Sequence, residues 1–264
     1  MKKISLYAWF GGNVSIFERF RIIKKVGFDS VSLYWGDDYP EITGNKYDVV
    51  QMVKKQFQLE VENIHAPYNH ADDLFSDDEH KAKAVLQTYI QCIHDAAQYD
   101  IPVVVFHLTG DHPNLPLKQE YLGRIQYLVH AALNYRVKIA FENLTDKGYS
   151  YLEKVLEIYQ EEVVGFCYDA GHDYIYSQTP FSFLKKYQKR LFAMHLHGNN
   201  GKNDSHQRIV DGSMDWTKLK AVLNSISFSC PIALEVIQNL HFEQLCDFEK
   251  YVKDLKKDCL FFLK

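Results

Sequence analysis

Val137-Lys138-Ile139-Ala140-Phe141-Glu142 is the stretch that decides the fold, because it is a strongly apolar run that ends in a carboxylate. Such a run is typical of a strand buried in a parallel sheet. If it is one of several parallel strands in a closed barrel, the groups at the strand ends converge on one rim and could hold a metal ion. The same pattern, ending in an imidazole or a carboxylate, recurs in Asn63-Ile64-His65, Val105-Phe106-His107, Cys167-Tyr168-Asp169, Ala193-Met194-His195 and Ala233-Leu234-Glu235.

Strand-like and helix-like segments alternate along the 264 residues. Eight strand–helix pairs predict a single (β/α)8 TIM barrel over residues 1–264, since an open doubly wound sheet would leave two edges to cover. The expected strands are 3–9, 30–35, 60–66, 102–107, 137–143, 164–169, 191–197 and 231–236. The expected helices are 15–26, 46–57, 77–98, 118–134, 149–160, 180–188, 215–226 and 241–262.

Local chemistry supports several of these boundaries. Ser76-Asp77-Asp78-Glu79 is expected to form a capping box, in which Ser76 accepts from an orphan amide and Glu79 reaches back. Gly27 follows the first helix where a left-handed residue would end it. Pro102 and Pro231 stand at strand starts, where a missing amide donor is tolerated.

The composition, with 47% hydrophobic residues, allows a large core, and the formal net charge is −4. This charge gives no global attraction for nucleic acid. The five cysteines lack any Cys-x-x-Cys spacing, which argues against a disulfide framework or a thiolate zinc site. We expect a cytoplasmic protein with no membrane partner, because no secretory signal and no apolar run of membrane-spanning length occur.

The segment from His195 to His206 is the richest in potential metal ligands. Alternate side chains of a strand share a face, so His195 and His197 are expected to point the same way. The Asn/Gly-rich loop that follows could return Asp204 and His206 to the same rim. The alternative is a polar surface loop with incidental histidines.

Asp169 and His172 form a second candidate pair, because a strand end and the turn after it could present both to one ion. The alternative is that Asp169 only caps a helix and His172 is exposed.

Glu142 and Glu235 each end an apolar strand, where a carboxylate is unfavourable unless it is paired or bound to a cation. No basic residue is adjacent to either in the sequence, which favours metal ligation. Asn143 could bind a substrate hydroxyl. His65 and His107 also end strands, although a lone histidine there is more often structural.

Three aromatic residues, Trp9, Trp35 and Tyr68, lie at expected strand ends. Flat rings there could bind the apolar face of a sugar or nucleoside, and core packing is the alternative. The sequence has no P-loop, no Gly-x-Gly-x-x-Gly and no Gly-x-Ser-x-Gly motif, which disfavours nucleotide-dependent and serine-nucleophile chemistry.

Taken together, these motifs resemble the xylose isomerase-like TIM-barrel superfamily, which includes sugar-phosphate isomerases and epimerases as well as endonuclease IV. The resemblance covers the chain from the first strand to the last helix. The motifs that carry it are Ile64-His65-Ala66-Pro67-Tyr68, Phe141-Glu142-Asn143, Tyr168-Asp169-Ala170-Gly171-His172, His195-Leu196-His197, Asp204-Ser205-His206 and Leu234-Glu235.

The resemblance implies a divalent metal centre of zinc or manganese with one to three ions. In the isomerase and epimerase branch it implies one ion, held by Glu142, Asp169, His195 and Glu235. In the endonuclease IV branch it implies three zinc ions, held by His65, His107, Glu142, Asp169, His172, His195, Asp204, His206 and Glu235. Two loops depart from the superfamily pattern, with Gly198 where Asp is frequent and Val210-Asp211-Gly212 where Gly-x-Gly is frequent.

The leading hypothesis is a metal-dependent isomerase or epimerase of a small sugar or polyol. Glu142 and Glu235 would move a proton as base and acid through a metal-stabilised enediolate, and His172 and His197 would bind substrate oxygens. The rival hypotheses are a zinc-dependent phosphodiester hydrolase of endonuclease IV type and a non-catalytic sugar-binding barrel. The acidic loops at residues 35–39 and 68–73 disfavour DNA as a partner. The oligomeric state stays open.

Overall fold

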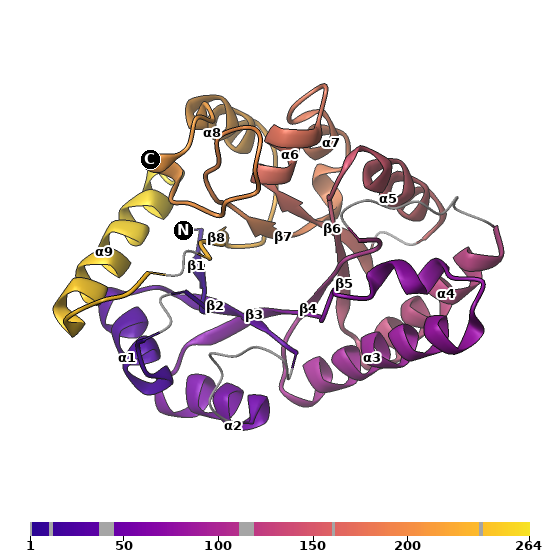
Figure 1. The fold of residues 1–264 in the computed structure, drawn as a ribbon, viewed down its shortest axis with the longest axis horizontal. Helices are drawn as coiled ribbons and strands as arrows, with labels where there is room; N and C mark the ends of the chain where they lie inside the picture. The colour runs from indigo at the N-terminus through magenta and orange to yellow at the C-terminus, as the bar shows by residue number, and fades with distance from the viewer. Residues whose placement is uncertain (1, 11–12, 37–44, 111–118, 160–161, 238–239) are drawn as a thin grey trace.

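The structure is a computed structural model that describes residues 2–10, 13–36, 45–110, 119–159, 162–237 and 240–264. Eight parallel strands form one sheet in the order β7-β6-β5-β4-β3-β2-β1-β8, and Figure 1 shows them as an inner ring with the helices outside. This confirms the expected (β/α)8 TIM barrel. The strands are β1 (Ile4–Tyr7), β2 (Ser30–Tyr34), β3 (Glu60–His65), β4 (Val103–Phe106), β5 (Lys138–Glu142), β6 (Val164–Asp169), β7 (Leu191–His195) and β8 (Ile232–Leu234).

The ring closes between β7 and β8. Leu196, just past the end of β7, forms a parallel bridge with Leu234. The Leu196 amide donates to the Ala233 carbonyl at 3.0 Å, and the Glu235 amide donates to the Leu196 carbonyl at 3.1 Å. β8 is only three residues long, so the two hydrogen bonds around Leu196 are an important part of this seam.

The helices lie between successive strands, and α9 follows the last strand. No helix in the described ranges is both long enough and apolar enough to cross a membrane. The helices are α1 (Ile16–Val26), α2 (Lys46–Gln51), α3 (Glu79–Gln98), α4 (Gln119–Tyr135), α5 (Asp146–Ile158), α6 (Ala170–Tyr176), α7 (Ser182–Lys186), α8 (Trp216–Ser225) and α9 (Leu245–Phe261).

Several helix boundaries differ from expectation. Asp78, not Ser76, caps α3, because its carboxylate accepts from the His80 and Lys81 amides. Ser76 instead accepts from the Asp78 amide. The expected capping box is therefore wrong, and the Glu79 carboxylate pairs with Arg124 on α4 at 2.6 Å.

Other boundaries agree better or shift only locally. Gly27 ends α1 with a φ of 90°, as expected for a left-handed cap. α6 begins directly after β6, where a turn was expected, and the expected helix over 180–188 is the shorter α7. Asp37 and Asp38, part of the acidic loop expected to repel DNA, lie outside the described residues.

The interior of the barrel is lined by small side chains. Val103, Val105, Ala140, Cys167 and Ala193 form an apolar cluster separate from the main core. On β1 and β2 the serines alternate with Leu6, Val31 and Leu33, which belong to the core shared with the helices, so the serines face the barrel interior. The interior is thus partly polar, with Ser5, Ser30 and Ser32 all buried.

Candidate metal centre

Four strands bring together three carboxylates and one imidazole at their carboxyl ends. These side chains belong to Glu142, Asp169, His195 and Glu235, and their ligand atoms all lie within 4.8 Å of one another. All four residues are buried. They follow or end β5, β6, β7 and β8, which are neighbours in the ring, so barrel closure gathers residues that are far apart in the sequence.

His195 shows best that this group fits a metal ion. Its Nδ1 atom lies 3.1 Å from Oε2 of Glu142 and 3.0 Å from Oε2 of Glu235. This buried Nδ1 nevertheless makes no hydrogen bond with any residue that the structure describes. Ligand atoms that surround one ion at about 2.1 Å are separated by roughly 3.0–3.5 Å without donating to one another. The donor set and its spacing therefore suit a divalent ion.

A second group lies at the ends of β3 and β4 and shares Glu142 with the first. Oε2 of Glu142 is 3.2 Å from Nε2 of His65 and 3.5 Å from Nε2 of His107. The other ring nitrogen of His65 lies 2.8 Å from the Ala66 carbonyl, which fixes the orientation of the ring. The three residues could hold a further ion beside the first.

A third group consists of His172, Asp204 and His206. Oδ2 of Asp204 lies 3.2 Å from Nε2 of His172 and 2.9 Å from Nε2 of His206. His206 has a φ of 42°, a left-handed conformation that few non-glycine residues adopt and that is often found at functional sites.

The loop after β7 makes this third group possible, because it returns toward the strand end. Gly198 and Gln207 form an antiparallel bridge, with backbone hydrogen bonds of 2.6 and 2.8 Å. A Cβ atom on Gly198 would lie 2.3 Å from the Arg208 carbonyl oxygen, so a larger residue does not fit there. The Asp that is frequent at this position in the superfamily pattern would therefore not fit this backbone.

Charge around the ligands keeps the carboxylates ionised. Burial acts to raise the pKa of Glu142, but His195 and His107 hold it well below its ordinary range. Burial also opposes ionisation of Asp169, yet its pKa is lowered, chiefly by His172. Both carboxylates are therefore negative at neutral pH and available as ligands.

The histidines show the complementary effect. Burial acts to lower the pKa of His172, but Asp169 and Asp204 raise it well above its ordinary value. Burial opposes protonation of His206 too, whereas the hydrogen bond with Asp204 raises its pKa to about 9. The carboxylates thus attract positive charge into the centre, and a divalent ion would supply that charge in place of protons.

His197 and Asn143, two residues expected to bind substrate, both contact Asp169. Nε2 of the buried His197 lies 3.1 and 3.0 Å from the two Asp169 carboxylate oxygens. The Asn143 side chain accepts from the Asp169 amide at 2.7 Å and donates to the Asp169 carbonyl at 2.8 Å and to the Tyr149 hydroxyl at 2.9 Å. His197 therefore holds the carboxylate of Asp169, and Asn143 holds its backbone.

The three aromatic candidates separate into two kinds. The exposed Tyr68 stacks on His107 with ring centroids 4.7 Å apart, which places it at the edge of the metal centre. Trp9 packs against Phe20 of α1, with centroids 6.2 Å apart. The Trp35 indole donates to Asp95 of α3 at 2.8 Å. Trp9 and Trp35 are buried against helices and are not grouped with Tyr68.

Three residues near the centre were missed in the sequence. The Cys167 thiol forms a possible ligand group with Glu142 and His195. The signal was present, because Cys167 lies two residues before Asp169 on β6 and so shares its face. Tyr34, rather than Trp35, is the ring near Tyr68, at a centroid distance of 6.0 Å.

The third missed residue is Asp173, one turn after Asp169 on α6. Its carboxylate accepts from the hydroxyls of Tyr149 and Tyr168 at 3.0 and 2.8 Å. Because Tyr149 also holds Asn143, these contacts connect the buried Asp173 to the backbone of Asp169.

Residues 20–254 match the family model described as xylose isomerase-like TIM barrel, so the chain belongs to this family. The uncharacterized protein y4fM of Sinorhizobium fredii is 31% identical over 103 residues, which is 38% of this chain and 33% of that protein. The uncharacterized protein MJ1311 of Methanocaldococcus jannaschii is 25% identical over 198 residues, which is 69% of this chain and 66% of that protein. The matches thus span less than two thirds of either relative.

Solved structures share the fold over nearly the whole chain. A D-tagatose 3-epimerase-like protein superposes with a TM-score of 0.73 and 21% identity, covering 99% of this chain and 100% of that chain. The D-allulose 3-epimerase of a Methylomonas species, in complex with D-allulose, has a TM-score of 0.75 and 14% identity, covering 99% of this chain and 96% of that chain.

Proposed function

We propose that the protein is a metal-dependent isomerase or epimerase of a small sugar. The observation that carries this proposal is the convergence of Glu142, Asp169, His195 and Glu235, with ligand atoms within 4.8 Å of one another. Three carboxylates and one imidazole suit manganese or zinc. When bound, the ion would polarise a substrate carbonyl and the adjacent hydroxyl, which makes the neighbouring carbon more acidic.

Glu142 and Glu235 are the proposed proton carriers. They come from β5 and β8, which are separated by β6 and β7 in the ring, so their carboxylates approach a substrate from different sides. One carboxylate would remove a proton from carbon and the other would return a proton to it. The low pKa of Glu142 keeps this group ionised and ready to act as a base.

Tyr68 offers a binding surface for the carbon skeleton of the substrate. It is 45% exposed, while the His107 ring behind it is largely buried. A flat ring beside polar groups is a common wall for the apolar face of a sugar. The D-tagatose and D-allulose named for the two similar structures make ketoses the first substrates to test.

The test is exchange of carbon-bound hydrogen. The protein is loaded with Mn²⁺ and incubated with D-tagatose, D-allulose or D-fructose in D2O, and the sugars are followed by NMR. We expect deuterium at the carbon next to the carbonyl and formation of an epimer or isomer. Glu142→Gln and Glu235→Gln should each abolish exchange, whereas Glu157→Gln, an exposed position on α5, should leave it unchanged. Saturable sugar binding without exchange would instead support a non-catalytic barrel.

A second candidate function is favoured by one specific observation. All nine residues that the endonuclease IV resemblance implies fall into groups around Glu142 or Asp204. Such a cluster suits a zinc-dependent phosphodiester hydrolase, in which several cations stabilise a phosphate under attack.

Asp204→Asn separates the two functions. It removes the carboxylate shared by His172 and His206 and leaves the four-residue group intact. Ketose exchange should survive this substitution, whereas a three-ion hydrolase should lose a zinc ion and its activity. Cleavage of DNA at an abasic site by the zinc-loaded protein, without any ketose exchange, would overturn the isomerase proposal.

A further inference from the structure

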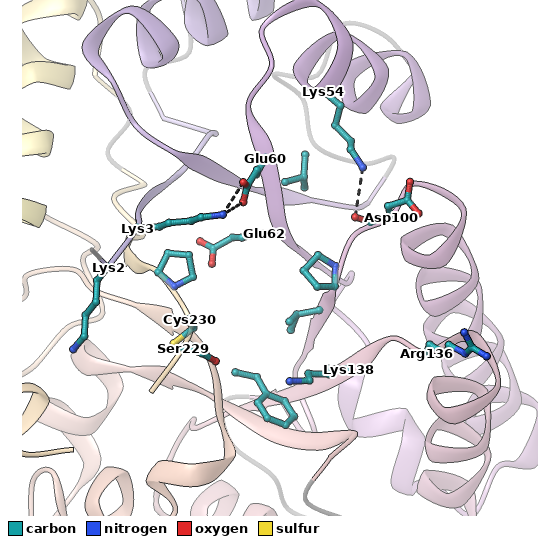
Figure 2. Close-up of a pocket in the computed structure, with 15 residues that line it drawn as sticks. Lys2, Lys3, Lys54, Glu60, Glu62, Asp100, Arg136, Lys138, Ser229 and Cys230 are labelled. Atoms are coloured by element: carbon teal, nitrogen blue, oxygen red, sulfur yellow. Dashed lines mark hydrogen bonds and ion pairs between the residues drawn. The ribbon is translucent and has the colours of Figure 1, made fainter. Parts of the chain in front are cut away.

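A cavity lies at the end of the barrel opposite to the metal centre. Its volume is about 910 Å³. It is lined by residues at the amino ends of β3, β4 and β5 and by the segments that precede β1 and β8, as Figure 2 shows. Val61, Pro102 and Phe192 contribute apolar surface to its walls. The cavity is therefore separate from the site at the carboxyl ends of the strands.

Basic residues surround the opening of this cavity. Two of the cations are engaged within the protein, since Lys3 pairs with Glu60 at 2.6 Å and Lys54 donates to the Asp100 carbonyl at 3.4 Å. Three more cations, from Lys2, Arg136 and Lys138, line the same cavity.

Lys2 and Lys138 are placed over rings. Lys2 lies 3.6 Å from the ring centroid of Phe228, and Lys138 lies 4.6 Å from that of Phe192. Such contacts hold an ammonium group in place while leaving its charge available to a second partner. Asp100 is the remaining acid at the rim, so the lining has an excess of positive charge.

Glu62 supplies the second, independent observation. It lines the cavity from inside the barrel, and Figure 2 shows its carboxylate within the ring formed by the basic residues. The residue is only 8% exposed, and its Oε1 atom makes no hydrogen bond with any residue that the structure describes.

The position of Glu62 has a local cause. The pairing of β2 with β3 shifts register, so that Val31 pairs with Val61 but Ser32 pairs with Asn63. Glu62 is the extra residue of this bulge. Bulges commonly redirect one side chain next to a functional site.

An internal carboxylate with an open acceptor is unfavourable for stability alone. A ligand hydroxyl could donate to it, while an anionic group on the same ligand contacted a cation at the opening. An organic amine would pair with Glu62 but would be repelled by three cations at the entrance.

We propose that this cavity is a second binding site, for a small hydroxylated anion such as a hydroxycarboxylate or a sugar phosphate. The anionic group binds Lys138, a hydroxyl donates to Glu62, and the apolar walls contact the carbon chain. Lys2 and Arg136 lie on opposite sides of the opening and add to its positive potential (Figure 2). The site is distinct from the proposed catalytic centre and does not depend on it.

Isothermal titration of the metal-loaded protein with four probes tests the proposal. Gluconate and ribose 5-phosphate carry both features, inorganic phosphate carries only the charge, and ribitol carries only the hydroxyls. We expect the first two to bind at least about tenfold more tightly than the last two. The tighter binder of the two shows whether the site prefers a carboxylate or a phosphate.

Two substitutions locate the binding site. Lys138→Glu should weaken binding of the tighter anion at least about tenfold, while Lys83→Glu, an exposed position on α3, should not. Glu62→Gln should reduce the preference for ribose 5-phosphate over inorganic phosphate. If Lys138→Glu fails to fold by circular dichroism, Lys138→Gln removes the same charge without reversing it and should also weaken binding.

Two results would overturn the proposal. One is the lack of saturable binding of both hydroxylated anions to the unmodified protein. The other is binding that neither the charge reversal nor Glu62→Gln alters, since the anion would then sit at another site, such as the metal centre.

Discussion

His197 and His206 stack face to face, with ring centroids 3.8 Å apart and ring planes inclined by 17°. One ring is hydrogen-bonded to Asp169 and the other to Asp204. The stacked pair therefore connects the four-residue metal group with the third group. Residues that hold a ligand in this way are important for metal affinity although they need not touch the ion.

His197→Phe tests this connection, because phenylalanine keeps a flat ring on His206 but cannot bond to Asp169. We expect the affinity for the first metal ion to fall by about 10–100-fold. Competition with a chelator of known affinity measures the change, and His94→Phe on the surface of α3 is the control. Equal affinities for His197→Phe and the unmodified protein would show that Asp169 is held without His197.

The protonated histidines predict that metal affinity depends on pH. The pKa of His206 is raised to about 9 and that of His172 lies well above its ordinary value. Both rings are therefore positively charged at pH 7 before metal binds. Both must lose a proton to act as ligands. If the third group takes up an ion, its affinity should rise with pH until pH 9 is passed.

Calorimetry in buffers with different ionisation enthalpies measures the protons released. We expect release at pH 7 to fall in Asp204→Asn, since the hydrogen bond that favours the charged form of His206 is removed. The same number of protons in both proteins would contradict this assignment.

Glu62 predicts a pH dependence of stability. Burial raises its pKa from 4.5 to about 7. The folded state binds the Glu62 proton more tightly than the unfolded state does. Protonation of Glu62 therefore stabilises the fold fully below pH 4.5, and this stabilisation is lost as the pH rises through about 7. The loss amounts to about 3 kcal/mol for a shift of this size.

Glu62→Gln should remove this loss. The difference in unfolding free energy, Glu62→Gln minus unmodified protein, should be about 3 kcal/mol more positive at pH 8 than at pH 4.5, because the variant escapes the destabilisation at high pH. Urea denaturation at the two pH values measures it, with Glu157→Gln as an exposed control. A constant difference at both pH values would mean that Glu62 ionises normally.

Trp35→Phe should affect stability rather than substrate binding. The indole hydrogen bond to the buried Asp95 carboxylate is lost, and a bond to a charged group contributes about 1.5–3 kcal/mol. We expect a lower free energy of unfolding and an unchanged KM for the ketose. Tyr68→Ala should show the opposite, with a raised KM and little loss of stability, because its side chain is half exposed. A raised KM in Trp35→Phe would return this residue to the substrate site.

The main features of the fold could be predicted because the signals are repeated. The strands β5 to β8 are short apolar runs that lead to an imidazole or a carboxylate, and barrel closure then gathers Glu142, Asp169, His195 and Glu235. The return of Asp204 and His206 was also predictable in outline, since the Asn/Gly-rich loop after His197 can turn the chain back.

Features that depend on the orientation of one side chain were harder to predict. Trp35 was placed at a strand end correctly, but the alternation of Ser30, Ser32 and Tyr34 with apolar residues shows that it faces the helices. Trp9 lies past the end of β1, where alternation no longer applies. Glu62 faces inward because of a bulge, and a register shift between two strands leaves no mark on one strand's sequence.

The metal centre lies at the seam between β7 and β8. Leu196 and Leu234 close the ring, and the neighbouring residues along the chain, His195 and Glu235, belong to the same ligand group. An ion held by His195 and Glu235 would bridge β7 and β8 and hold the short last strand in the ring. The backbone around Leu196 already closes the ring, so metal binding would reinforce this seam and couple occupancy of the site to the stability of the barrel.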